Sequence, residues 1–107
     1  EYSNSRPHHI MEFDVIDNCR LANNKLFAVV QGKKDGIPDG IKVDKNGNVY
    51  TGMADGIQVF DAHGTLLGCI LLPLPCANFC FGGKDFSTLY MCVDAAIYCV
   101  KLTVPGC

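Results

Sequence analysis

Asp39, in the sequence Pro38-Asp39-Gly40, is the residue whose type and setting raise the question of chemistry. A carboxylate can accept a proton as a general base, or bind a cation. The same three residues are also typical of a turn, because proline fixes φ and glycine tolerates positive φ. The residues alone favour the turn, so any chemical role for Asp39 depends on the elements that position it.

A second polar group follows at Asp44, Asn46 and Asn48, with the alternate spacing of a calcium-binding loop. Gly47 occupies a position where an EF-hand loop has no glycine, and no glutamate follows at the required distance. The Asn46-Gly47 pair instead predicts a two-residue hairpin turn of type I′, since both residues accept positive φ. We therefore interpret this segment as a hairpin.

The three histidines do not suggest a catalytic group. His8 and His9 are adjacent, so on a strand they point to opposite faces and chelate poorly. His63 lies in a predicted turn. We expect all three at the surface, and the sequence shows no obvious Ser-His-Asp or Cys-His set.

Seven cysteines are many for a chain of this size and favour an oxidising compartment. We therefore expect an extracellular protein, with a cytoplasmic location as the alternative. The odd number leaves at least one thiol unpaired or bonded between chains. A two-residue turn at Ala95-Ala96 would place Cys92 opposite Cys99 and permit a disulfide; two thiols in the core are the other interpretation. The seven are Cys19, Cys69, Cys76, Cys80, Cys92, Cys99 and Cys107.

Composition limits the class of protein. The chain has 107 residues, of which 49% are hydrophobic, and a net charge of −2, which suits one domain with a core. The balanced charge argues against nucleic acid or an anionic membrane as partner. The longest apolar run, 66–74, is interrupted by Gly68 and Pro73, so no membrane-spanning segment is expected. The start at Glu1, without a methionine, suggests a mature form or a fragment.

An internal repeat organises the chain. IMEFD begins at Ile10, IQVFD at Ile57 and IYCVK at Ile97, and the last two are 40 residues apart. Val49 and Leu89, in two similar Tyr-containing segments, are also 40 apart. A period near 40 with about four short strands is typical of a β-propeller blade. The fold class predicted is therefore all-β.

The repeat divides residues 1–107 into about two and a half four-stranded antiparallel blades. Residues 39–72 are predicted to form a complete blade, with strands at 40–43, 48–53, 57–61 and 66–72. Residues 8–30 would be the outer strands of the preceding blade, and 76–102 a blade without its outermost strand. Asn78 begins this last blade at the position equivalent to the Asp39 region. It either faces a central channel or satisfies backbone groups.

Several segments together resemble the gluconolactonase/regucalcin (senescence marker protein) family, and most of all its fungal gluconolactonase and lactonohydrolase branch. They are RPHHIMEFDV, PDGIKVDKNGNVYTG, DGIQVFDAHGTLLG, NFCFGGKDFSTLYM and IYCVKL, which cover the chain from about Arg6 to Leu102. The joint pattern is specific, although no single segment is. The resemblance implies a six-bladed propeller that holds a divalent metal, usually calcium, in its central channel.

The resemblance also implies an activity, the hydrolysis of sugar lactones or related esters by metal-activated water. Asp39 matches the aspartate that in this family binds the metal and is thought to shuttle a proton. The family's other metal ligands and main substrate-binding residues precede anything in this chain. Calcium takes six to eight oxygen ligands, so we expect the chain alone to bind metal weakly and to turn over little.

Two hypotheses follow. In the first, the chain is part of a calcium-dependent lactonase and contributes Asp39 to its channel. In the second, it is a non-catalytic, stand-alone remnant whose exposed strand edges pair with further copies, as unpaired edges tend to do. Its partners would then be other copies of the chain, or the missing N-terminal blades.

Overall fold

The computed structural model describes residues 8–30 and 37–107, so Arg6 and Pro7 of the resemblance lie outside the described residues. Within those ranges the chain forms nine strands and no helix, and every strand pair is antiparallel. The predicted all-β, antiparallel fold is confirmed. The strands are β1 (His8–Ile16), β2 (Arg20–Val30), β3 (Ile41–Val43), β4 (Val49–Met53), β5 (Gly56–Phe60), β6 (Leu66–Leu71), β7 (Cys76–Gly82), β8 (Thr88–Val93) and β9 (Ala96–Lys101).

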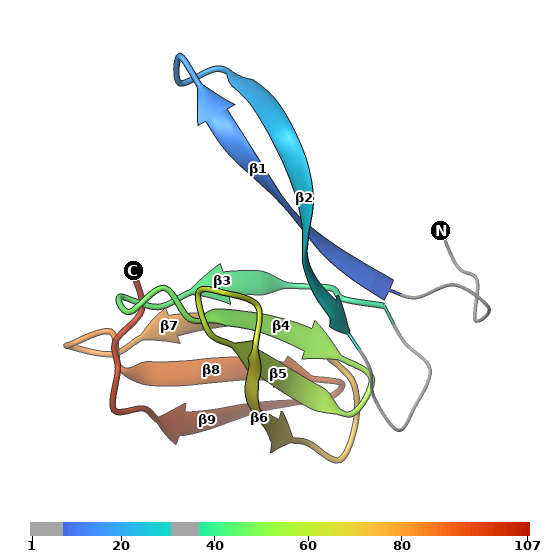
Figure 1. The fold of residues 1–107 in the computed structure, drawn as a ribbon. Helices are drawn as coiled ribbons and strands as arrows, with labels where there is room; N and C mark the ends of the chain where they lie inside the picture. The colour runs from blue at the N-terminus through green and yellow to red at the C-terminus, as the bar shows by residue number, and fades with distance from the viewer. Residues whose placement is uncertain (1–7, 31–36) are drawn as a thin grey trace.

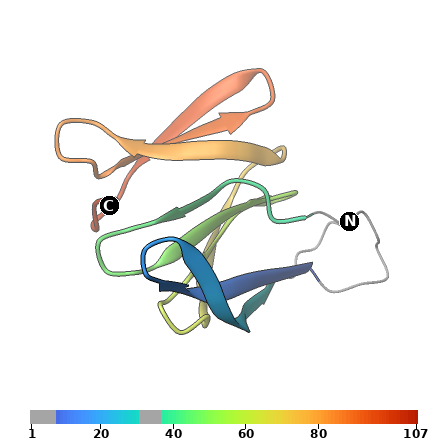
Figure 2. The same ribbon diagram turned by 90° about the horizontal axis from the view of Figure 1, so that it is seen from above.

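The strands form three separate sheets, which lie one after another in chain order (Figures 1 and 2). The first is the β1–β2 hairpin, the second has the order β3-β4-β5-β6, and the third has the order β7-β8-β9. Within each sheet, every strand pairs with its neighbour in sequence. The tip of the β1–β2 hairpin projects beyond the other two sheets (Figure 1).

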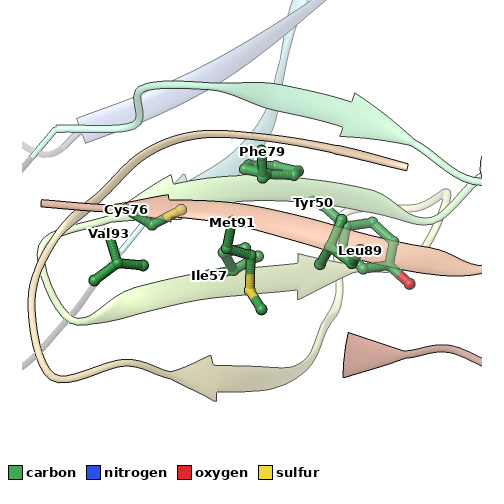
Figure 3. Close-up of a cluster of buried hydrophobic side chains, with 7 residues drawn as sticks. All are labelled: Tyr50, Ile57, Cys76, Phe79, Leu89, Met91 and Val93. Atoms are coloured by element: carbon green, nitrogen blue, oxygen red, sulfur yellow. The ribbon is translucent and has the colours of Figure 1, made fainter. Parts of the chain in front are cut away.

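Two buried clusters hold the sheets together. Tyr50 and Ile57 of the second sheet pack against β7 and β8 of the third, in a cluster completed by Cys76, Phe79, Leu89, Met91 and Val93 (Figure 3). On the other side of the second sheet, Met53 and Phe60 pack against Ala28 and Val30 of β2. The two inner strands of the second sheet, β4 and β5, are therefore covered on both faces, while β3 and β6 are largely exposed.

The β3–β4 connection differs from the predicted two-residue turn at Asn46-Gly47. The Gly47 N–H donates to the carbonyl of Asp44 at 3.0 Å, and only Gly47 has positive φ, at 83°. A type I′ turn needs positive φ at both central residues. The chain instead turns over Lys45 and Asn46, and Gly47 provides the left-handed residue that ends the turn. The type I′ prediction was wrong because it ignored Asp44, whose carboxylate fixes this loop.

The predicted juxtaposition of Cys92 and Cys99 is also wrong. β8 and β9 join through Asp94 and Ala95, so Cys92 pairs with Ile97, and Cys99 pairs with Tyr90. Asp94 adopts a φ of 52°, which aspartate tolerates better than alanine and which places the turn one residue earlier than predicted. All seven cysteines lie in the described ranges, and all are free thiols.

The residues after β9 fold back across the second and third sheets. Asp44 and Gly106 form an isolated bridge, and the Lys45 N–H donates to Pro105 O at 3.0 Å. The Gly106 N–H also donates to Phe86 O at 2.9 Å. A side chain at Gly106 would collide with the ring of Phe81. The tail therefore joins the β3–β4 loop to the β7–β8 loop.

Candidate functional site

Asp39 lies two residues before β3, the edge strand of the four-stranded sheet. Its N–H donates to the carbonyl of Gly52 at 3.1 Å, and the Gly52 N–H donates to Gly40 O at 2.9 Å. These two bonds extend the β3–β4 pairing and fix the backbone of Asp39, while its side chain is exposed. An exposed carboxylate on a fixed backbone is what a ligand-binding role requires, and the metal-facing role of Asp39 stays a prediction.

The next sheet approaches this position closely. The Gly40 N–H donates to the carbonyl of Ala77 at 3.1 Å. A Cβ atom at Gly40 would lie 2.8 Å from Oδ1 of Asn78, and one at Gly52 would collide with the carbonyl oxygen of Cys76. Two glycines thus allow the start of β3 and the end of β4 to contact the start of β7. The sequence-predicted residues Asp39 and Asn78 are brought to the same junction.

Asn78 is exposed, and its Oδ1 accepts a hydrogen bond of 2.9 Å from the N–H of Phe79. Because Oδ1 accepts this bond, the amide oxygen serves the backbone at least in part, as one of the two sequence interpretations proposed. The channel-facing role of Asn78 stays a prediction.

Cys76 is buried beside this junction, and its Sγ donates to the carbonyl of Asn78 at 3.4 Å. Burial is the largest cause of a raised pKa for the Cys76 thiol, and backbone hydrogen bonds at Asn78 and Cys92 offset it only in part. Cys76 is therefore a protonated, apolar thiol next to the candidate site, which sequence reasoning did not connect with Asp39.

The described residues do not provide a complete calcium site. Across residues 8–30 and 37–107, no three side chains of His, Cys, Asp or Glu gather closely enough to hold a metal ion. The carboxylate of Asp39 and the amide of Asn78 supply far fewer than six oxygen ligands. Asp44 cannot add to them, because both of its oxygens already accept hydrogen bonds within its own loop.

The histidines do not contribute to this site. His9 and His63 are exposed, as expected, and His8 is half-buried. The Nε2 atom of His8 is buried and has no hydrogen-bond partner. None of the three lies in the segments that adjoin Asp39.

A cavity in the described part of the chain lies elsewhere, between β1 and β3. It has a volume of about 260 Å³ and is lined mainly by apolar side chains, among them Ile10, Phe27, Ile41 and Val43. Glu12 is its one acidic lining residue, and this carboxylate pairs with Lys25 at 3.5 Å. The cavity lacks a convergent polar set, so it does not replace the Asp39 junction as candidate site.

Sequence reasoning missed the two glycines that create the junction. Gly40 and Gly52 flank the predicted β3–β4 hairpin, and a glycine within a strand often marks the close approach of another backbone. That signal was present in the sequence. The partner of the glycines, the segment around Cys76 and Ala77, lies too far along the chain to be recognised without the structure.

Comparison with known proteins identifies the family. Residues 2–94 match the model of the SMP-30/Gluconolactonase/LRE-like region. The chain belongs to this family. Its sheets are accordingly blades of a β-propeller, as the repeat predicted. Within the described ranges, no helix combines the length and the apolar character that crossing a membrane demands.

Individual relatives agree with this assignment. A lactonohydrolase of Aspergillus oryzae is 30% identical over 106 residues, which are 99% of this chain and 22% of that protein. A gluconolactonase of Zymomonas mobilis is 41% identical over 73 residues, 66% of this chain and 20% of that protein. The structure of a putative gluconolactonase superposes with a TM-score of 0.83 at 27% identity, over 92% of this chain and 33% of that one. The chain thus spans between a fifth and a third of the length of these relatives.

Proposed function

We propose that the chain is part of a metal-dependent lactone hydrolase and supplies Asp39 to the site of that enzyme. Family membership supports the reaction class. The observation that carries the proposal for Asp39 is its fixed backbone and exposed carboxylate at the junction of two blades. The proposed substrate is a sugar lactone or a related ester, and the proposed metal is a divalent cation, with calcium first.

The described residues supply only part of such a site, so the proposal assigns the remaining ligands to further blades. Asp39 would be one oxygen ligand and the proton-accepting group. The chain alone is expected to show no saturable calcium binding in the micromolar range and no lactone hydrolysis above background, because one carboxylate and one amide cannot hold the ion.

A chimera tests the proposal directly. The segment of the Aspergillus oryzae lactonohydrolase that aligns with this chain would be replaced by residues 1–107. We expect hydrolysis of a sugar lactone that a chelator abolishes, and loss of this activity with Asp39→Asn. Asp94→Asn, which changes an exposed aspartate in the β8–β9 turn, is the matched control. A chimera that unfolds cooperatively but is inactive, or an Asp39→Asn chimera that is fully active, would contradict the proposal.

A second candidate function is a non-catalytic piece that assembles with itself through exposed strand edges. The observation in its favour is that, within the described residues, the three sheets are open and their outermost strands have an edge without a strand partner. Native mass and lactone hydrolysis, each with and without chelator, separate the two functions. A monomer with chelator-sensitive hydrolysis would exclude the assembly, and a large, inactive, metal-free assembly would exclude the isolated enzyme. An extracellular location remains a proposal that rests on the cysteine content.

A further inference from the structure

Two neighbouring blades bring a second polar side chain to the Asp39 junction. The Gly40 N–H donates to the carbonyl oxygen of Ala77 at 3.1 Å. This hydrogen bond joins the peptide group after Asp39 to the peptide group before Asn78. A Cβ atom at Gly40 would lie 2.8 Å from Oδ1 of Asn78 and 3.2 Å from its Cα atom. The side chain of Asn78 therefore lies against the backbone that carries Asp39.

A β-bulge at the start of β7 turns Asn78 away from the core. The register of β7 with β8 shifts between Cys76 and Asn78, so Ala77 is an extra residue of β7. Cys76 and Phe79 are both buried, whereas residues three apart on a regular strand lie on opposite faces. Asn78 is exposed between them. Bulges often occur next to active sites, where they redirect a side chain, and this one leaves Asn78 at the Asp39 junction.

The amide of Asn78 is oriented by the backbone of its own strand. Its Oδ1 accepts a hydrogen bond of 2.9 Å from the N–H of Phe79. An amide nitrogen cannot accept such a bond, so this contact distinguishes the oxygen from the nitrogen. Nδ2 makes no hydrogen bond to residues 8–30 and 37–107. Asn78 therefore presents an oriented donor beside Asp39.

A ligand at this junction meets two groups with opposite requirements. The carboxylate of Asp39 accepts a proton or binds a cation, whereas Nδ2 of Asn78 can only donate and needs an oxygen on the ligand. Under the proposed function, the lactone carbonyl is the group that a divalent cation would polarise. The oxygens that remain for Nδ2 are the ring oxygen and, on a sugar lactone, the hydroxyl groups. The hydroxyl oxygens are the better acceptors, because the ring oxygen shares its lone pairs with the carbonyl group.

We propose that Asn78 is a substrate-binding residue that selects hydroxylated lactones, because its Nδ2 donates to a hydroxyl oxygen of the lactone held at Asp39. The inference rests on the proposed lactone hydrolase and adds the residue that distinguishes a sugar lactone from an unsubstituted one. Asn78 contributes to binding and takes no part in proton transfer. Its removal should therefore change the preference between substrates without abolishing hydrolysis.

Two lactones with the same ring size test this role. Glucono-δ-lactone carries hydroxyl groups on its ring, and δ-valerolactone carries none. Both would be offered to the chimera that contains residues 1–107, and kcat and KM would be measured for each. A residue that only supports the fold would change the hydrolysis of both lactones by the same factor. The ratio of the two kcat/KM values therefore reports on the hydroxyl contact.

Asn78→Ala removes the donor and should lower kcat/KM for glucono-δ-lactone about fivefold relative to δ-valerolactone, mainly through KM, as expected for one neutral hydrogen bond. Asn78→Ser is the second variant, because it removes the amide but retains a side-chain oxygen near the N–H of Phe79, and the same change in the ratio is expected. Asn24→Ala, at an exposed asparagine of β2, is the matched control and should leave the ratio unchanged.

The outcomes separate this inference from the function on which it rests. An unchanged ratio in active, cooperatively melting Asn78→Ala and Asn78→Ser chimeras would overturn the inference and leave the lactone hydrolase proposal intact. Hydrolysis of neither lactone by the unsubstituted chimera would overturn the proposed function, and with it this role for Asn78. Asp39→Asn should abolish hydrolysis of both lactones, which distinguishes the proposed ligand from the residue that selects the substrate.

Discussion

At the scale of single residues, Asp44 is the best example of a polar group that serves the fold. Its side chain is 1% exposed and accepts from the backbone N–H groups of Asn46 and Asn48 and from Nδ2 of Asn48, at 2.9–3.0 Å. The hydroxyl of Tyr50 points to it at 3.4 Å. Burial raises the pKa of Tyr50, and the negative charge of Asp44 raises it further. Asp44 thus links a loop to the core.

Asp44→Ala should destabilise the chain substantially, because it leaves part-buried N–H groups and a buried hydroxyl without their acceptor. A loss of about 3 kcal/mol in the free energy of unfolding is expected. Asp61→Ala is the control: Asp61 accepts from the backbone of His63 and Thr65 in the same pattern, but at an exposed turn. Urea denaturation of the two variants should show a clearly smaller loss for Asp61→Ala, and equal losses would contradict the importance of burial.

Asp85 makes the stability of the β7–β8 loop dependent on pH. Hydrogen bonds from Ser87, and then the ammonium group of Lys101 at 3.0 Å, hold the pKa of Asp85 well below its ordinary value of 3.8. Because the folded-state pKa is lowered, the contribution of Asp85 is fully present above pH 4 and decreases as the pH falls below that value. Asp85→Asn should therefore flatten the loss of stability on acidification.

Thermal melts at several pH values between about 2 and 5 test this expectation, since the effect of Asp85 lies in that interval. Lys84→Gln, a substitution at the neighbouring residue that also changes one charge, is the control and should keep the acid dependence of the unchanged chain. Identical pH profiles for Asp85→Asn and the unchanged chain would show that Asp85 does not contribute.

At the scale of elements, the junction between β3, β4 and β7 depends on glycine. Asp39 keeps its place because Gly40 and Gly52 let the inner strands of two blades touch. A substitution at Gly40 or Gly52 should therefore change both the stability of the chain and the position of Asp39, the proposed metal ligand.

Gly52→Ala should force β4 away from β7, because the new methyl group would collide with the backbone of Cys76. The free energy of unfolding should fall by about 2 kcal/mol, because the added methyl group overpacks the junction. Gly68→Ala is the control, since a Cβ atom at Gly68 of β6 meets no atom within 4 Å. Chemical denaturation measures both, and a neutral Gly52→Ala would disprove the close approach.

The sequence predicted the elements well, because the forty-residue period and the turn-forming residues are local signals. Those signals were sufficient for the strands around Val49, Ile57 and Leu89. These local signals did not predict features that depend on a distant contact or on a single backbone angle. The positive φ of Asp94 sets the register that separates Cys92 from Cys99, and no composition rule selects Asp94 over its neighbours.

The candidate site was predictable only in part for the same reason. Asp39 could be selected from its motif and from the family resemblance. Its surroundings could not, since Cys76 and Ala77 reach it through contacts between sheets. The tail contact between Asp44 and Gly106 joins residues from opposite ends of the blade pair and has no signature in the sequence.

At the scale of the whole molecule, the distribution of thiols reports on packing. Cys76 is buried, and the other six cysteines are exposed. Because burial raises its pKa, Cys76 carries less reactive thiolate than an exposed cysteine. Alkylation followed by mass spectrometry should label six sites quickly, and Cys76 only on unfolding.

Tyr90 and Ile97 hold the same places in the strand pairing of the third sheet as Tyr50 and Ile57 hold in the second, 40 residues earlier. This repetition has a consequence for how such chains can evolve. Because each blade offers its successor the same surface, duplication or loss of a forty-residue unit in the gene leaves every remaining contact intact. Chains of different length can then arise by whole units without any new packing solution.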